Sequence, residues 1–499
     1  MNCHLLDAVK RSDVKMVNCL VALGADVNAP CKLTLPLVIA ADGRNTRMCL
    51  ALVNHGASLH EVVSNPSSPC FGHSPLSLAV CSGLTNAVSY LVMFGADINV
   101  EIDWSICVYN PLHVSPGSSL LHAAVARGDR VIIDSLLQAG CSLNKVSTKG
   151  DTPLLLACRR SDPDVAKHLL VATKACKEKL NPDAMNTLTG QTSLLEAVAR
   201  NDTSLARHLL DAGCDVNLHT YGGMTALHYA VTLRRELMLS GVLLSVKGCD
   251  VNVRDDAGLT PLHVAATYRD PLFAELLLDA GANCNRSSLD GQSPLHFAAK
   301  GGHCCMIELL VGRGANVNNA TLEGETPLVC AVERGNIDAC RALLSYGTIL
   351  TDCPGKDSAL VCSIYRRSED ISALLVASGA STILSHSSPV SPIHMMIVSE
   401  QRRTLELLVA AGFSYTRQDI VVASASDESD KIVSWLHSLL ETPKSLKELS
   451  RVVVRTTLSE HAQGRTIVPL VELLDLPAVL LKYLLLGVDN LCLVDTLQC

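Results

Sequence analysis

The sequence predicts an all-α protein, in which about twelve helix–turn–helix repeats and a capping unit precede a small three-helix module. Two observations carry this prediction. A unit of about 33 residues returns with small changes through most of the 499-residue chain, and a different pattern begins at Lys444. Self-similarity at such a period is typical of solenoids, where each unit packs only on its neighbours.

The repeat is clearest at Gly258–Asn283, where GLTPLHVAA leads into an apolar stretch that ends DAGAN. A period near 33 residues around a TPLH core is the signature of ankyrin repeats, and this part of the chain resembles them. Leu5–Asn28 forms a first unit. In later units the His position of TPLH is taken by Val38, Ser77, His122, Leu155, Leu195, His228, His263, His296, Val329, Val361 and His394.

Each letter of the repeat has a physical reason. Thr260 is an N-cap residue, and Pro261 at the first helical position loses no hydrogen bond. Gly281 lets the second helix end in a left-handed conformation. The histidines recur at a structural spacing, so we expect them to hydrogen-bond within their own turns rather than to bind metal or move protons.

Surplus spacing between units predicts long connections at 62–72, 101–117 and 174–184. Such loops project from one face of a repeat array, often the binding face. Trp104 and Tyr109 in the second loop are therefore candidate substrate-binding residues. The alternative is that both side chains pack against the array itself.

Composition excludes several classes of function. The formal net charge is −8, with 41 basic and 49 acidic residues, and aromatic residues make up 3% of the chain. This composition argues against nucleic-acid binding, which needs a basic surface and, for single strands, aromatic stacking platforms. Met1–Lys10 lacks the positive-then-apolar pattern of a signal peptide, and no uncharged apolar run reaches the roughly 18 residues of a membrane span. We expect an intracellular protein, cytoplasmic with the nucleus possible, that has no membrane partner.

An enzymatic role finds no support. The sequence contains no P-loop, no G-x-S-x-G and no H-E-x-x-H motif, so we expect no catalytic residue, no cofactor and no metal site. The 21 cysteines show no repeated zinc spacing. Several take small buried positions of the repeat, as expected for free thiols in a reducing compartment: Cys49, Cys158, Cys330, Cys340 and Cys362.

After the repeats, 416–441 reads as a degenerate capping unit of the 1–441 array. Ser445–Glu448 then forms a capping box, which predicts that a helix begins at Leu446. Leu446, Leu449 and Val453 share one face of this helix, with Ser450 and Val454 alongside. Two further apolar stretches complete a module at 443–487. So small a unit cannot bury its apolar faces, which suggests a docking surface; the tail 488–499 is unassigned.

The module resembles a SOCS box. Leu446, Ser450 and Val454 match the elongin-binding box, and Leu474-Asp475-Leu476-Pro477 begins the segment that matches its L-P-L-P-x-x-L-K-x-Y-L ending. A repeat array with this ending resembles the ankyrin repeat and SOCS box family. The resemblance implies elongin B/C, cullin-5 with its RING protein, and an unknown protein substrate as partners. It assigns elongin binding to Leu446, Leu449, Ser450, Val453 and Val454, and cullin binding to Leu474, Asp475, Leu476 and Pro477.

The implied function is that of a non-catalytic substrate receptor of a ubiquitin ligase. Two departures leave an alternative open. The box usually has Cys where this chain has Ser450, whose hydroxyl costs about 1–3 kcal/mol if it is buried without a partner. Asp475 replaces the first Pro of the cullin motif. The alternative is an ankyrin scaffold whose degenerate SOCS box assembles no ligase.

Overall fold

The structure is a computed structural model. It describes residues 2–30, 34–60, 63, 72–99, 115–160, 163–172, 178–234, 237–350, 358–380, 395, 396, 399, 401–411, 451, 452, 454, 455, 457, 458, 461, 462, 465–469 and 484. The chain forms two compact units, Met1–Cys249 and Asp250–Cys499.

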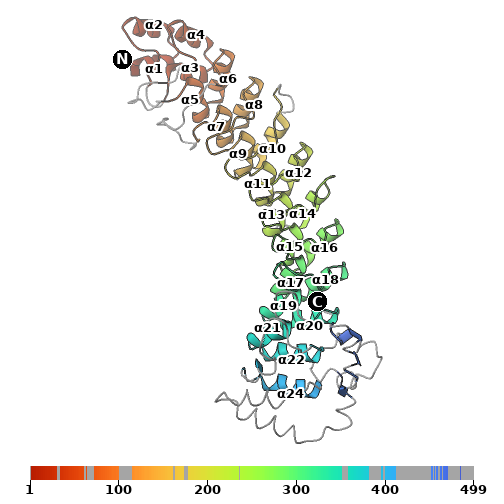
Figure 1. Ribbon diagram of the computed structural model, residues 1–499. Coiled ribbons are helices and arrows are strands. Elements are labelled where there is room, and N and C mark those ends of the chain that lie inside the picture. Colours follow the sequence, from red (N-terminus) through yellow and green to blue (C-terminus); the bar gives the residue numbers. More distant parts are fainter. Residues whose placement is uncertain are drawn as a thin grey trace. The chain divides into compact units, whose positions relative to one another are not determined.

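The described part of the first unit folds into helices that alternate between two layers (Figure 1). Odd-numbered helices contact the next odd-numbered helix, and most even-numbered helices contact the next even-numbered one, as α5, α7, α9 and α11 do on one side and α6, α8, α10 and α12 on the other. The helices are α1 (Asn2–Lys10), α2 (Val14–Ala22), α3 (Pro36–Asp42), α4 (Thr46–Asn54), α5 (Pro75–Ser82), α6 (Thr85–Met93), α7 (Leu120–Arg127), α8 (Arg130–Gln138), α9 (Pro153–Arg159), α10 (Pro163–Ala172), α11 (Ser193–Ala199), α12 (Thr203–Asp211), α13 (Ala226–Thr232) and α14 (Leu237–Leu244).

The second unit continues the same scheme. First helices α15, α17, α19 and α21 contact one another in order, as do second helices α18, α20, α22 and α24. Their bounds are α15 (Pro261–Ala266), α16 (Leu272–Asp279), α17 (Pro294–Gly301), α18 (Cys304–Gly312), α19 (Pro327–Glu333), α20 (Ile337–Ser345), α21 (Ala359–Tyr365), α22 (Glu369–Ala377) and α24 (Arg402–Ala411).

Within the described residues every regular element is a helix, and β-pairing is confined to the isolated bridges His219–Thr225 and Ile349–Arg465. The predicted all-α repeat fold is therefore confirmed. No described helix is long and apolar enough to cross a membrane.

Helices begin and end at the residues that the repeat pattern predicts. The Thr152 side chain accepts a hydrogen bond from the amide of Leu155, and Pro153 is the first residue of α9. Gly281 and Gly314, which follow second helices, have φ of +91° and +90°. Both lie in the left-handed region that glycine adopts without strain. Local chemistry therefore sets the boundaries of each repeat.

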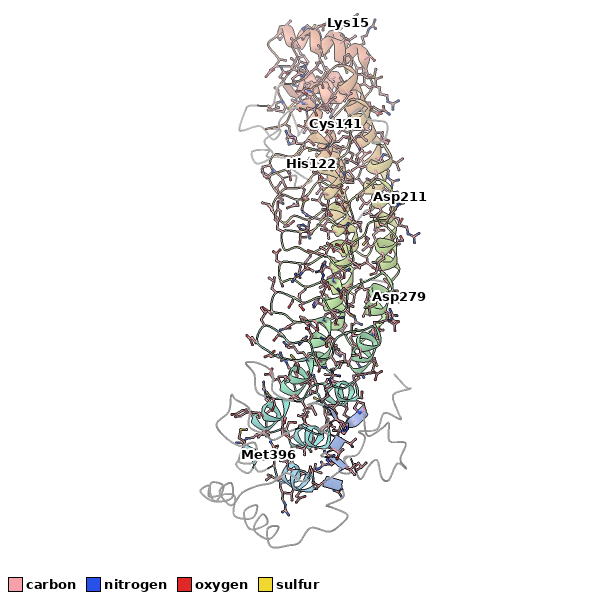
Figure 2. All side chains as sticks on the ribbon, turned by 45° about the vertical axis from the view of Figure 1, so that its right-hand side comes forward. Lys15, His122, Cys141, Asp211, Asp279 and Met396 are labelled. Carbon is pink, nitrogen blue, oxygen red and sulfur yellow. The ribbon has the colours of Figure 1, made fainter. Side chains whose placement is uncertain are left out.

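The core lies between the two helix layers, and it buries the two layers unequally. In α7 every residue from Leu120 to Ala126 is buried, whereas α8 buries only one face, formed by Ile132, Ile133, Leu136 and Leu137. Figure 2 shows the same division in the first unit, with His122 of α7 on the side of the first helices and loops and Asp211 on the side of the second helices. First helices therefore form the continuous interior of each unit.

Cysteines fill small positions of this core. Cys49, Cys158, Cys330 and Cys340 are buried free thiols, as the repeat pattern predicts. Cys362 is only partly buried, so the prediction was wrong there; its side chain does not lie on the fully buried face of α21. Burial raises the pKa of the Cys158, Cys330 and Cys340 thiols to about 12. At neutral pH these thiols are protonated and unreactive.

Candidate functional site

The predicted elongin-binding helix is represented by its C-terminal half. Described positions between 451 and 462 are helical. Val454 is 38% exposed, whereas the next residue, Arg455, is 4% exposed. Successive helix residues point about 100° apart, so this helix has one face toward the protein and a neighbouring face toward solvent. Leu446, Leu449, Ser450 and Val453 lie outside the described residues, and the role in elongin binding of these four residues and of Val454 stays a prediction.

Arg455 reaches from the C-terminal module to the repeat array. Its guanidinium donates hydrogen bonds to the carbonyl oxygens of Val376 and Ala377, at 3.0 and 3.1 Å, and to that of Leu484. Burial lowers the pKa of Arg455 to about 10, and the positive charge of nearby Arg451 is a second, smaller cause. The side chain therefore remains a cation at neutral pH. Sequence reasoning did not identify this residue.

A second contact lies beside it. The amide of Ile467 donates to the carbonyl of Ser378 at 2.9 Å, and that of Thr466 donates to Thr348 at 3.0 Å. Arg465 pairs with Ile349 in an antiparallel bridge. The C-terminal module thus lies against the ends of α20 and α22.

The repeat histidines have the structural role that their spacing predicts. The Thr260 amide donates to Nδ1 of His263 at 3.0 Å, while Nε2 lies 3.0 Å from the carbonyl of Gln292 in the next repeat. This arrangement requires the tautomer protonated at Nε2. His122 and His296 make the same contacts with Ser119 and Ser293, and with the following repeat. The predicted hydrogen bonding within the turn is confirmed; His394 lies outside the described residues.

Burial is the main cause that lowers the pKa of His263 and His296, to about 4 in each case. The pKa of His122 is also lowered, for the same reason. Protonation at Nδ1 would remove the acceptor of the cap amide. These side chains are therefore neutral at physiological pH and tie consecutive repeats together.

A buried ion network occupies the repeats where leucine replaces this histidine. Arg159 donates to Asp151 at 2.8 Å and to Glu196 at 3.0 Å. Asn186 donates to the other oxygen of Asp151 at 2.7 Å. Asp151 and Glu196 are buried, while Arg159 is about one-third exposed. The network joins neighbouring repeats where Leu155 and Leu195 cannot hydrogen-bond.

Loops between repeats present large apolar side chains to solvent. Leu322 is 80% exposed, and Leu289 of the preceding loop is also exposed. The two loops are joined because the Leu322 amide donates to the carbonyl of Asp290 at 3.1 Å. In the first unit, Leu188 and Tyr221 occupy comparable exposed positions. Exposed apolar side chains on adjacent loops indicate a surface for protein contact.

These loop residues were not predicted, although a signal was present: each stands within two residues before a turn glycine, in Leu188-Thr189-Gly190, Tyr221-Gly222-Gly223, Leu289-Asp290-Gly291 and Leu322-Glu323-Gly324. Trp104, Tyr109 and the predicted cullin-binding residues Leu474, Asp475, Leu476 and Pro477 lie outside the described residues. Within the described part, no three His, Cys, Asp or Glu side chains gather in a way that could hold a metal ion.

Comparison with known families agrees with both parts of the chain. Models of ankyrin repeats match residues 5–102, 239–321 and 295–386, and a single ankyrin repeat matches 149–184. The model of the SOCS box matches residues 442–485. The SOCS-box match includes the helix of Val454 and Arg455 and the segment that contacts Ser378.

Proposed function

The chain belongs to the ankyrin repeat and SOCS box family, and from this membership we propose that it is the substrate receptor of a ubiquitin ligase containing elongin B/C, cullin-5 and a RING protein. Ankyrin repeats with a SOCS box are the parts of a substrate-receptor adaptor of elongin–cullin ligases in general. The choice of cullin-5 rests on the resemblance of Leu474–Pro477 to the cullin motif.

The observation that carries the proposal is the orientation of the elongin-binding helix. Arg455 faces the repeat array, and Val454 faces solvent. In an α-helix Leu446, Ser450 and Val454 are spaced four residues apart and share one side. That side would be free to enter an apolar pocket of elongin C, with Leu449 and Val453 beside it.

The mechanism is proximity. The array holds a target protein while the assembled ligase brings a ubiquitin-charged enzyme close to the target's lysines, which raises their effective concentration. The receptor itself supplies no reacting group. Its proposed location is the cytoplasm, with the nucleus as the alternative.

The target surface includes the exposed loop residues of the repeats. Leu188 and Tyr221 supply apolar contact area on adjacent loops of the first unit, and Leu289 and Leu322 do so in the second unit. Trp104 and Tyr109, from the long loop 101–117, are further candidates for target contact. Aromatic and large aliphatic anchors of this kind dominate protein–protein binding energies.

The test is capture of elongin C and cullin-5 by the full chain and by Leu446→Ala. Truncation of a buried interface anchor costs about 2 kcal/mol or more, which is more than tenfold in affinity. Leu23→Ala, at an exposed leucine of the first repeat, is the matched control and should capture both partners normally. Capture unaffected by Leu446→Ala would contradict the assignment of the helix.

A scaffold that assembles no ligase is the second candidate, because Ser450 and Asp475 depart from the SOCS box pattern. It predicts that the wild-type chain captures neither elongin C nor cullin-5. Capture of elongin C without cullin-5 would locate the defect at Asp475 instead.

A further inference from the structure

The SOCS box contacts the flank of the repeat array rather than its last repeat alone. Its described contacts are to Thr348 and Ile349, after α20, and to Val376–Ser378, at the end of α22, although α24 follows later in the array. The segment 465–468 therefore crosses the ends of two successive second helices. We call Arg455 together with segment 465–468 the array joint.

Arg455 donates to carbonyl groups at the end of α22, of which that of Val376 also accepts from the Gly379 amide at 3.1 Å. The last carbonyls of a helix have no partner within the helix and carry partial negative charge, which favours a cation. Two of its three acceptors, Val376 and Ala377, belong to α22, and the third, Leu484, belongs to the SOCS box. The guanidinium fork suits this task because its donors diverge in fixed directions.

The neighbouring contacts close the joint. The Ser378 carbonyl, next along the same helix end, accepts from the Ile467 amide at 2.9 Å and from the Thr466 hydroxyl at 3.3 Å. Ile467 is fully buried, and its Cγ2 lies 3.0 Å from where a Cβ on Gly379 would stand. Glycine at 379 is therefore what lets the isoleucine approach the backbone. Hydrogen bonds and close packing together fix this contact.

We propose that Arg455 is a positioning residue: it fastens the SOCS box to α22, so that the elongin-binding helix keeps one orientation relative to the C-terminal repeats. The consequence for ubiquitin transfer rests on the proposed ligase function. The joint itself is a property of the chain alone. A ligase held in one orientation reaches a restricted set of lysines, and a loosened joint widens that set.

Hydrogen exchange of the full-length chain tests the joint without any partner. The Thr466 and Ile467 amides donate to the array, so they exchange only when the joint opens. Arg455→Ala should accelerate their exchange at least about tenfold, whereas Arg402→Ala, at an exposed arginine of α24 paired with Glu406, should leave it unchanged. Protection of α17 amides reports that each variant is folded.

Ile467→Ala is the second variant, for the case that Arg455→Ala fails to fold. It removes the packing contact and keeps the guanidinium, and it should also accelerate exchange of the Thr466 amide. Unchanged exchange in folded variants would overturn the proposal. If Arg455→Ala is unfolded, Thr466 exchange that stays slow in Ile467→Ala would overturn the joint as described, because hydrogen bonds and the packing of Ile467 are expected to hold it together.

The functional arm uses the chain's own lysines as acceptors in a reconstituted ligase. Arg455→Ala should capture elongin B/C within about threefold of wild type, yet be modified at more lysines of the array. An identical modification pattern would show that Arg455 does not position the ligase. If wild type captures no elongin, the proposed function fails while the exchange experiment still decides the joint.

Discussion

His263 Nε2 lies 3.0 Å from the carbonyl oxygen of Gln292, which stands 29 residues ahead in the next repeat. Nδ1 of the same ring accepts a hydrogen bond from the backbone amide of Thr260, the N-cap residue of α15. One neutral imidazole therefore completes its own helix turn and connects two repeats, and the connection depends on the protonation state of the ring.

The first prediction concerns pH. The pKa of His263 and His296 is about 4 in the folded chain and about 6.5 when unfolded, so the unfolded chain binds more protons between these values. Above pH 6.5 the two histidines make their full contribution to the free energy of unfolding. As pH falls toward 4 this contribution is lost, by about 3 kcal/mol for each histidine. Urea denaturation at pH 7 and pH 4 measures this loss.

His263→Leu introduces the side chain that other repeats carry at this position, as at Leu155 and Leu195. It should reduce the loss in the free energy of unfolding between pH 7 and pH 4. Val329→Leu occupies the same position of another repeat and controls for the leucine side chain. A pH dependence that is the same in both variants would contradict the role given to His263.

The second prediction concerns the ion network of Arg159. Arg159→Leu leaves the buried carboxylates of Asp151 and Glu196 without their cation, and we expect a loss of about 2–4 kcal/mol in the free energy of unfolding. Arg130→Leu breaks an exposed pair with Asp164 and should cost less than about 1 kcal/mol. Urea denaturation measures the free energy of unfolding of the two variants. Equal losses in this free energy would mean that the network contributes no more than a surface ion pair.

The third prediction separates backbone strain from steric conflict. Gly281 and Gly291 both have left-handed φ, at +91° and +80°. A Cβ on Gly281 meets nothing within 4 Å, whereas one on Gly291 would lie 2.7 Å from the Leu322 amide nitrogen. Gly281→Ala should cost about 1–2 kcal/mol from conformation alone. Gly291→Ala should cost about 1–3 kcal/mol more because the next loop must move.

Thermal or urea denaturation of the two alanine variants gives the difference directly. If both lose the same stability, the loop that carries Leu322 moves aside freely and is not held by its neighbour.

The fourth prediction concerns the cullin motif. Asp475→Pro restores the usual residue of the resemblance and should raise cullin-5 capture by elongin-loaded protein at least about threefold. Ser450→Cys is the companion variant and should act on elongin capture instead. Biolayer interferometry with each partner measures both. Cullin-5 binding weakened by Asp475→Pro would argue that the chain uses a different cullin contact.

Much of the fold follows from the sequence because its determinants are local. Thr260, Pro261 and His263 lie within four residues, and together they define how α15 begins. The ion network and Arg455 could not be found in this way. The carbonyl groups of the array that accept from Arg455 are 78 and 79 residues away in the sequence. The helix that carries them has no sequence pattern that predicts such a partner. The elongin and cullin residues were assigned by resemblance, and the roles of all of them, including Val454, stay predictions.

Because the SOCS box contacts the ends of α20 and α22, the repeats differ in how freely they could be inserted or lost during evolution. Repeats before α19 make none of the described contacts with the SOCS box, so units could be inserted or lost there while the attachment of the SOCS box stays intact. Each such event would change, in steps of one repeat, the number of units that precede the anchored end. The last units lack that freedom, because altering them also displaces the SOCS box that contacts them.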